Sequence, residues 1–432
     1  MADQSEGPGT HPVKTVYLHV GCRKSGTSAL QNALGRSVEA LEEQGLAQPL
    51  LGRGSTTRDL VEPLRTAAAG DPAPARAAIT ALADRIRASD RPRHLITLEA
   101  MAELPAVATA IVADGLAEFD THVVVTARPW ALTIPSEWQQ QLKSRYTGEY
   151  VAYAEAVRDA AGATPEAAEE AALFRRRQDV GDVVRRWRAG ARPLTVHVLL
   201  VPHDRTSRPD LLDLFCDLVG IDRAQLRVPS RVVNQSLSRE DAEVLRRVNL
   251  ALGDALTDLR GDYRYSVRKF IGVQAMMRRR RSPGGRIRLP RDLEDWAAQE
   301  SRRQLDEVRA HGAEVVGDVD GFLRPTLPGD DHAPVTDAEA ATAAAVVIAE
   351  LAREHAKQHR QARRKAKQRR KAGGKKTGGK AGGKKAAGPT TPPSAGTPGE
   401  GAAATAAGEA RRALRGARRT LGGLRDRGRS AR

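Results

Sequence analysis

A glycine-rich loop between an apolar run and an amphipathic segment constrains the fold of this chain more than any other feature. Residues 15–20 are apolar enough to form a buried strand, and the chain then passes two glycines, Gly21 and Gly26. Apolar side chains recur at helical spacing from Leu30 until Gly45 ends the pattern. A strand, a glycine loop and a helix in this order direct backbone amides towards a phosphate. The stretch therefore predicts an anion-binding loop at the end of a strand.

The position of the lysine distinguishes this loop from that of nucleotidases. A Walker loop has its lysine directly after the second glycine. Here Thr27 occupies that position, and Lys24 precedes Gly26 by two residues in the order Gly-Cys-Arg-Lys-Ser-Gly-Thr-Ser of residues 21–28. Taken alone, the stretch leaves a plain glycine turn between strand and helix open as an alternative.

Further apolar runs alternate with helical patterns along the chain. Strands are expected at 45–49, 93–98, 121–127 and 194–201. Helices are expected at 58–69, 74–89, 132–145, 165–188, 209–219, 238–254 and 292–311. Near-continuous apolar strands alternating with helices indicate a parallel sheet covered on both faces. The predicted fold class is therefore α/β, a three-layer sandwich around a parallel sheet.

Three polar or glycine positions follow three of these strands directly. Gly21, Glu99 and Arg128 each lie where an expected strand ends. Ligands of such sheets bind beyond the carboxyl ends of the strands. We therefore expect the three positions to meet at one edge of the sheet.

The loop resembles the 5′-phosphosulfate loop of sulfotransferases that use 3′-phosphoadenosine-5′-phosphosulfate (PAPS). The resemblance rests on Lys24-Ser25-Gly26-Thr27, and on Arg128 followed eight residues later by Ser136. Softer similarity over residues 13–328 extends it to a bacterial sulfotransferase-like family common in actinobacteria. The resemblance implies the P-loop sulfotransferase fold and the transfer of a sulfuryl group to a hydroxyl or amine of a glycan or another acceptor.

The resemblance also implies roles for individual residues. The 5′-phosphosulfate is expected to contact Arg23, Lys24, Ser25, Gly26, Thr27 and Ser28. Lys24 would stabilise charge on the bridging oxygen, and no metal is implied. Arg128, and Ser136 at the start of a helix, would bind the 3′-phosphate, a role that suits a two-pronged guanidinium. Glu99 is the leading candidate for the base, with Glu103 a weaker substitute.

Some positions depart from the family pattern or have no assigned role. Cys22 and Arg23 stand where relatives more often have small residues or proline, and Thr97 and Leu98 replace the serines that often precede the glutamate. A later basic cluster, Arg264, Arg268 and Lys269, is expected to face solvent or the acceptor; closure over the nucleotide, which the resemblance implies for a late basic loop, stays open. His19 lies within a strand and is expected to be a core histidine.

Charge is distributed very unevenly along the 432 residues. The net charge is +17, but residues 351–432 contain 24 Lys/Arg against 4 Asp/Glu, whereas the first 350 residues contain 46 against 49. A slightly acidic body therefore precedes a strongly basic tail. The tail is expected to bind an anionic polymer, nucleic acid or an anionic membrane surface, or to serve only as a solubilising extension.

Composition suggests how the chain is divided and where it works. We expect a disordered leader at 1–12, an α/β domain at 13–330, a basic helical extension at 331–372 and a disordered tail at 373–432. Two cysteines cannot form a disulfide framework, and no signal peptide or membrane span is evident. A cytoplasmic protein is expected, with peripheral membrane association through the tail as a further option.

Two other functions stay open at this point. A P-loop kinase or nucleotide-binding protein shares the strand–loop–helix pattern, although Thr27 stands where its lysine belongs. A polyanion-binding protein on a vestigial sulfotransferase scaffold would explain the basic tail.

Overall fold

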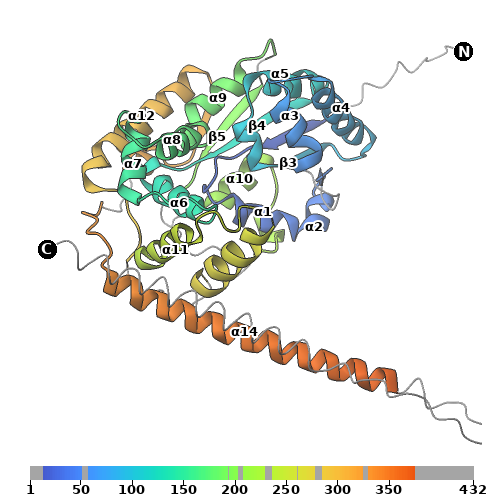
Figure 1. Ribbon diagram of the computed structural model, residues 1–432. Coiled ribbons are helices and arrows are strands. Elements are labelled where there is room, and N and C mark those ends of the chain that lie inside the picture. Colours follow the sequence, from blue (N-terminus) through green and yellow to red (C-terminus); the bar gives the residue numbers. More distant parts are fainter. Residues whose placement is uncertain are drawn as a thin grey trace, which may run out of the picture. The chain divides into compact units, whose positions relative to one another are not determined.

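The computed structural model describes residues 13–50, 57–192, 194–202, 208–228, 236–259, 261–277, 285–324 and 329–374 (Figure 1). Within them the chain forms an α/β fold around a six-stranded sheet in the order β2-β3-β1-β4-β5-β6. All its strand pairs are parallel. The strands are β1 (Thr15–His19), β2 (Leu46–Ala47), β3 (Arg93–Thr97), β4 (Asp120–Ala127), β5 (Thr195–Leu200) and β6 (Glu314–Val316). The predicted α/β class with a parallel sheet is confirmed.

Helices flank both faces of the sheet. In chain order they are α1 (Thr27–Gly35), α2 (Val38–Glu43), α3 (Glu62–Thr66), α4 (Ala73–Ala88), α5 (Ala106–Gly115), α6 (Trp130–Leu142), α7 (Tyr150–Arg158), α8 (Pro165–Gln178), α9 (Val180–Arg188), α10 (Leu211–Val219), α11 (Arg239–Leu252), α12 (Glu294–Ala310), α13 (Val319–Leu323) and α14 (Asp337–Gly374). Two π-helical segments are η1 (Thr57–Val61) and η4 (Arg264–Met277). Three 3-10 helices are η2 (Glu99–Glu103), η3 (Arg223–Gln225) and η5 (Arg291–Leu293).

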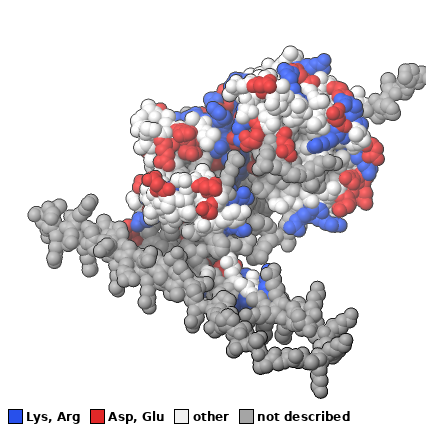
Figure 2. All heavy atoms as spheres, turned by 45° about the vertical axis from the view of Figure 1, so that its right-hand side comes forward, with Lys and Arg blue, Asp and Glu red and all other residues white. Residues whose placement is uncertain are grey.

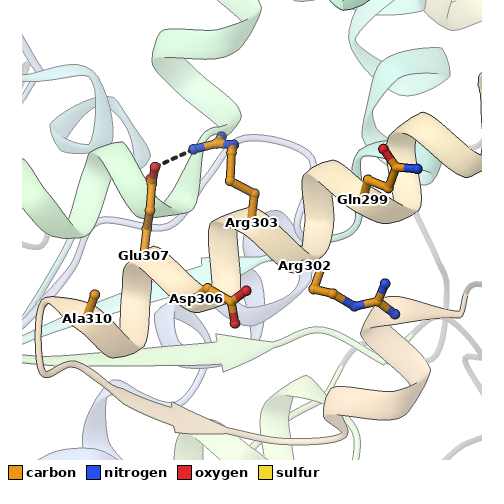
Figure 3. Close-up of a pocket in the computed structure, with 6 residues that line it drawn as sticks. All are labelled: Gln299, Arg302, Arg303, Asp306, Glu307 and Ala310. Atoms are coloured by element: carbon orange, nitrogen blue, oxygen red, sulfur yellow. Dashed lines mark hydrogen bonds and ion pairs between the residues drawn. The ribbon is translucent and has the colours of Figure 1, made fainter.

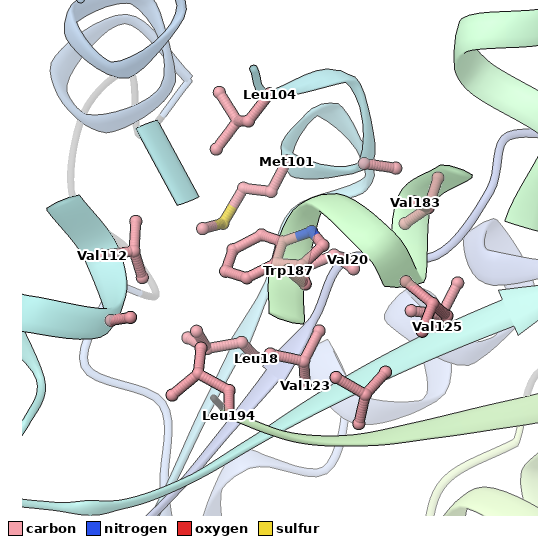
Figure 4. Packing of buried hydrophobic residues seen from close by; sticks show 14 of the residues in the cluster. Leu18, Val20, Met101, Leu104, Val112, Val123, Val125, Val183, Trp187 and Leu194 are labelled. Carbon is pink, nitrogen blue, oxygen red and sulfur yellow. The ribbon is translucent and has the colours of Figure 1, made fainter. Parts of the chain in front are cut away.

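The apolar strands bury side chains on both faces, as their sequences predict. On one face, Leu18 and Val123 pack with α3, α4, α5 and α9, and Figure 4 shows Trp187 of α9 close to both and to Met101. On the other face, Val124 packs with α1, α2 and α10. The helix that follows β1 and the helix that follows β3 therefore cover opposite faces. Ligands of such sheets bind at the carboxyl ends of the strands where the connections change faces, and the glycine loop lies at the carboxyl end of β1.

A second apolar cluster forms away from the sheet. It joins α6, α7, α8, α11, η4 and the first turns of α14. Trp130 and Trp138 of α6 are both buried in it, and the indole of Trp130 donates a hydrogen bond to the carbonyl of Gln178 at 3.0 Å. This cluster fixes α6 and η4, two elements that border the glycine loop.

Two details of the helices differ from the sequence-based expectation. The single helix expected at 165–188 is broken into α8 and α9, because the carboxylate of Asp179 caps α9 by accepting a hydrogen bond from the amide of Asp182 at 3.1 Å. Helix α7 has no counterpart among the expected helices. It packs its tyrosines, Tyr150 and Tyr153, into the second cluster.

The basic extension begins as part of the folded body. Residues 1–361 form one compact unit and residues 362–432 a second. In the first, Ala340, Ala343 and Val347 of α14 are buried, the last two of them in the second apolar cluster. In the second, residues 362–374 continue as helix, and the disordered tail expected at 373–432 lies almost wholly outside the described residues, as does the leader expected at 1–12.

The described surface contains both signs of charge. Figure 2 shows Lys/Arg and Asp/Glu side chains interspersed over the face in view, as the near-balanced composition of the first 350 residues predicts. Among the described residues, no helix is both long enough and apolar enough to cross a bilayer.

Candidate anion-binding site

The glycine loop continues the sheet beyond the end of β1. The amide of Val20 donates to the carbonyl of Val124 at 3.0 Å, and the amide of Cys22 donates to the carbonyl of Thr126 at 2.9 Å. Gly21 lies between them, and a Cβ on it would lie only 2.3 Å from Thr126 Oγ1. A glycine is therefore required here because the loop backbone passes directly against the side chain of the neighbouring strand.

The turn of the loop is built from two left-handed residues. Lys24 has φ 63° and Gly26 has φ 85°. Gly26 is the N-cap of α1 and makes no side-chain capping bond. Its carbonyl accepts from the amides of Ala29 and Leu30, which leaves the amides of Thr27 and Ser28 at the helix start. Left-handed residues beside a helix start turn successive amides towards one concavity, which suits an anion.

The side chains of Ser25 and Thr27, both expected to contact the ligand, are buried. Ser25 is fully buried, and its hydroxyl bonds the carbonyl of Cys22 and, at 2.6 Å, Thr126 Oγ1. Its side chain therefore fixes the loop, and its amide is the group left for a ligand. Thr27 is 1% exposed, whereas Ser28 is exposed at the helix start.

Lys24 reaches from the loop to α6. Its ammonium donates a hydrogen bond to Gln140 Oε1 at 2.8 Å. Burial lowers the pKa of Lys24, while the carboxylates of Glu137 and Glu99 act in the opposite direction. The lysine is thus held at the edge of the loop by a neutral partner and by carboxylates from two separate elements.

Glu99 begins η2 directly after β3 and faces the loop cations. Burial raises the pKa of this carboxyl, and the charges of Arg23 and Lys24 oppose the rise. Glu103 has a different environment, because it pairs with Arg177 at 3.0 Å and with Arg23 at 3.5 Å. Of the two candidate bases, Glu99 is therefore the one whose carboxylate is not tied into arginine ion pairs.

Glu137 belongs to the site and was missed by the sequence analysis. It is 1% exposed, and its Oε1 accepts a hydrogen bond from Gln178 Nε2 at 3.1 Å. The same Gln178 amide donates to the carbonyl of Arg23 at 2.8 Å, which ties α8 to the loop. Glu137 lies three residues before Gln140, on the same face of α6, but nothing in the sequence links that face of the helix to Lys24.

Arg128 has the expected local structure, directly after a strand, whereas Ser136 does not lie at the start of a helix. Arg128 follows β4 and is half-buried. Ser136 does not open a helix, because α6 already begins at Trp130, whose buried side chain anchors the first turn. The hydroxyl of Ser136 donates back to the carbonyl of Leu132 at 3.0 Å. The serine therefore offers its hydroxyl alone, without the free amides of a helix start.

Two further residues at the loop are buried and have shifted pKa values. His19 is fully buried, bonds Thr97 Oγ1 at 2.8 Å through Nδ1, and has its pKa lowered to about 4 by burial. Burial raises the pKa of the Cys22 thiol to about 12. A position in a helix-start loop can lower the pKa of a thiol, but burial outweighs that effect at Cys22.

A surface depression lies elsewhere. It has a volume of about 530 Å³ and is lined along α12 by Gln299, Arg302, Arg303, Asp306, Glu307 and Ala310 (Figure 3). Arg303 is already paired with Glu307 at 2.6 Å and with Asp179 at 2.5 Å. The depression is thus a face of one helix with one of its arginines already paired. The described residues also include no group of three or more side chains suited to hold a metal ion.

No family model, curated protein or solved structure matched this chain in comparisons with known proteins. The assignment of a function therefore rests on the residues of the loop and their neighbours.

Proposed function

We propose that the chain is a sulfotransferase of the P-loop sulfotransferase fold, which moves a sulfuryl group from PAPS to a hydroxyl or amine of a glycan or other acceptor. The observation that supports this most is the position of Lys24. It lies before the second glycine, in a left-handed turn, and its ammonium is held at the loop rim by Gln140. A Walker lysine follows the second glycine instead.

The residues at the loop fit the two ends of this nucleotide. Amides of residues 23–28 and the Ser28 hydroxyl would hold the 5′-phosphosulfate, and Lys24 would stabilise charge on the leaving oxygen. Arg128 and the hydroxyl of Ser136 would contact the 3′-phosphate. PAPS supplies the activated sulfuryl group, and this chain positions it for in-line displacement.

A thermal-shift comparison tests the nucleotide. Adenosine 3′,5′-bisphosphate should raise the melting temperature at concentrations where ADP does not, because ADP lacks the 3′-phosphate that Arg128 would bind. Arg128→Leu should remove this difference between the two nucleotides. Stabilisation by ATP with magnesium alone would contradict the proposal and favour a P-loop kinase.

Glu99 is our candidate for the base that accepts the acceptor proton. Glu99→Gln should lower turnover by about a hundredfold or more, because general-base catalysis contributes on that scale. The base acts when deprotonated, so the rate should rise as pH passes upward through the raised pKa of Glu99. The Glu99→Gln enzyme should lack that acidic limb.

The control for this prediction is Glu103→Gln, which changes a neighbouring carboxylate already paired with arginines. It should leave the acidic limb of the pH–rate profile in place. If Glu99→Gln turns over at the normal rate with an unchanged profile, Glu99 is not the base.

A further inference from the structure

A buried lysine outside the glycine loop, Lys143, lies near cations of the loop and of η4. Lys143 caps the C-terminus of α6 and is 8% exposed. The charges that act on it come from Lys24 of the loop and Arg268 of η4, and no carboxylate of the described residues acts on it comparably. Arg268 in turn is acted on by Arg23 and Arg264. Several cations therefore converge beside the loop.

A lysine near the C-terminus of a helix often donates to its last carbonyl groups, but the last carbonyl of α6 does not need Lys143. The carbonyl of Leu142 at the end of α6 already accepts hydrogen bonds from Asn249 Nδ2 at 2.8 Å and from Tyr263 Oη at 3.1 Å. Among the described residues, the ammonium of Lys143 makes no hydrogen bond and no ion pair. Its Nζ keeps some contact with solvent, so the ammonium is left for a partner from outside the chain.

The side chain of Lys143 is placed by two elements. It lies three residues after Gln140 on α6, and therefore on the same face as the residue that holds the Lys24 ammonium. On the other side, η4 passes along its aliphatic stem, where a Cβ on Gly272 would lie 3.8 Å from Lys143 Cγ. Gly272 is one helical turn beyond Arg268. The loop, α6 and η4 thus each carry one cation, and the charges of the three act on one another.

We propose that Lys24, Lys143 and Arg268 together form an oxyanion site, which holds a sulfate or phosphate group next to the glycine loop. The group is either the sulfuryl end of the nucleotide or an acidic group of the acceptor. A bound anion is attracted by all three cations and offsets the repulsion between them. This inference deepens the proposed function at the same site and rests on it only for the identity of the nucleotide.

Protonation of Lys143 is linked to the anion. Burial first, and then Lys24 and Arg268, lower the pKa of Lys143 to about 7. The ammonium is the form that attracts an anion, and it is lost as pH rises through that value. From pH 6 to pH 8 the affinity for a non-titrating anion should therefore fall about tenfold, because only about a tenth of the lysine is charged at the higher pH.

The test measures the binding of inorganic sulfate, which does not titrate in this range, by thermal shift at constant ionic strength between pH 6 and pH 8. The wild-type chain should show the tenfold fall. At pH 6, Lys143→Met should bind sulfate at least about tenfold more weakly than the wild type. Lys143→Arg should bind well at both pH values, because arginine stays charged, and it also controls for titration of Lys24.

The outcomes separate this inference from the proposed function. If Lys143→Met binds sulfate like the wild type with the same pH dependence, or if the wild type does not bind sulfate at all, the oxyanion site is refuted. If sulfate binding depends on Lys143 but adenosine 3′,5′-bisphosphate does not bind, the site stands and the proposed function fails. Sulfate that binds together with the bisphosphate occupies the place of the transferred or acceptor group, and sulfate that is excluded by it marks the 5′-phosphate position.

Discussion

Replacing Lys24 by alanine is expected to lower the rate of sulfuryl transfer by about a hundred- to a thousandfold, the range found when one donor to a developing charge is removed. Lys24 is positioned at the loop rim by its hydrogen bond to Gln140. Its charge matters most as the bond to sulfur breaks and the leaving oxygen becomes negative. The backbone amides of residues 23–28 do not depend on this side chain, so much of the affinity for adenosine 3′,5′-bisphosphate should persist.

The measurement is transfer of radiolabelled sulfate from PAPS to a panel of phenols, amines and oligosaccharides, beside a binding titration with the bisphosphate. Lys24→Met is the matched variant, because it keeps the apolar stem and removes the charge. Alanine and methionine have the same cost as lysine in this left-handed backbone, so the two variants should not differ from the wild type in backbone strain. Equal turnover of wild type and both variants would remove Lys24 from the mechanism.

Replacing Gly21 by alanine is expected to lower the free energy of unfolding by about 2 to 3 kcal/mol, the usual range for overpacking a tight site. The new Cβ would approach Thr126 Oγ1 at 2.3 Å and Thr27 Cγ2 at 2.8 Å. Thr126 cannot turn away freely, because its hydroxyl is bonded to the buried Ser25. The strain must therefore move the loop, and anion binding should fall together with stability.

Gly35→Ala is the matched control for this substitution. It lies at the end of α1, and a Cβ there would meet nothing within 4 Å. Alanine is a better helix former than glycine, so this variant should be neutral or stabilised by up to about 1 kcal/mol. Chemical denaturation of both variants, with sulfate binding as a second readout, checks the pair. A Gly21→Ala chain as stable as the Gly35→Ala chain would show that the loop accommodates a side chain.

Most of the sheet could be predicted from the sequence because its strands are buried on both faces. Residues 121–127 illustrate this, since β4 buries Val123 and Val125 towards one set of helices and Val124 towards the other. Such a strand must be apolar almost throughout, and that pattern is visible in a single sequence. Because β1, β3 and β4 are parallel, their carboxyl ends lie at one edge of the sheet, and Gly21, Glu99 and Arg128 follow those ends.

The missed parts of the site lie on helices, where the sequence gives no such signal. Glu137 and Lys143 are polar residues of α6 and its C-terminal cap, and a polar residue on a helix is ordinarily exposed. They are buried because α8 and η4 pack over them, a tertiary effect that helical periodicity cannot indicate. The start of α6 was misplaced by two residues because the buried Trp130 anchors the first turn earlier than the pattern of apolar residues indicates.

The all-parallel sheet has a consequence for synthesis of the chain on the ribosome. No two of its strands can be joined by a hairpin, so every pairing waits for a later segment. Thr15 of β1 pairs with Arg93 of β3 and with Asp120 of β4, and β4 then pairs with β5. The glycine loop leaves the ribosome before its supports from α6, α8 and η4. During that interval the apolar β1 lacks its partners in the sheet and is exposed to association with other chains.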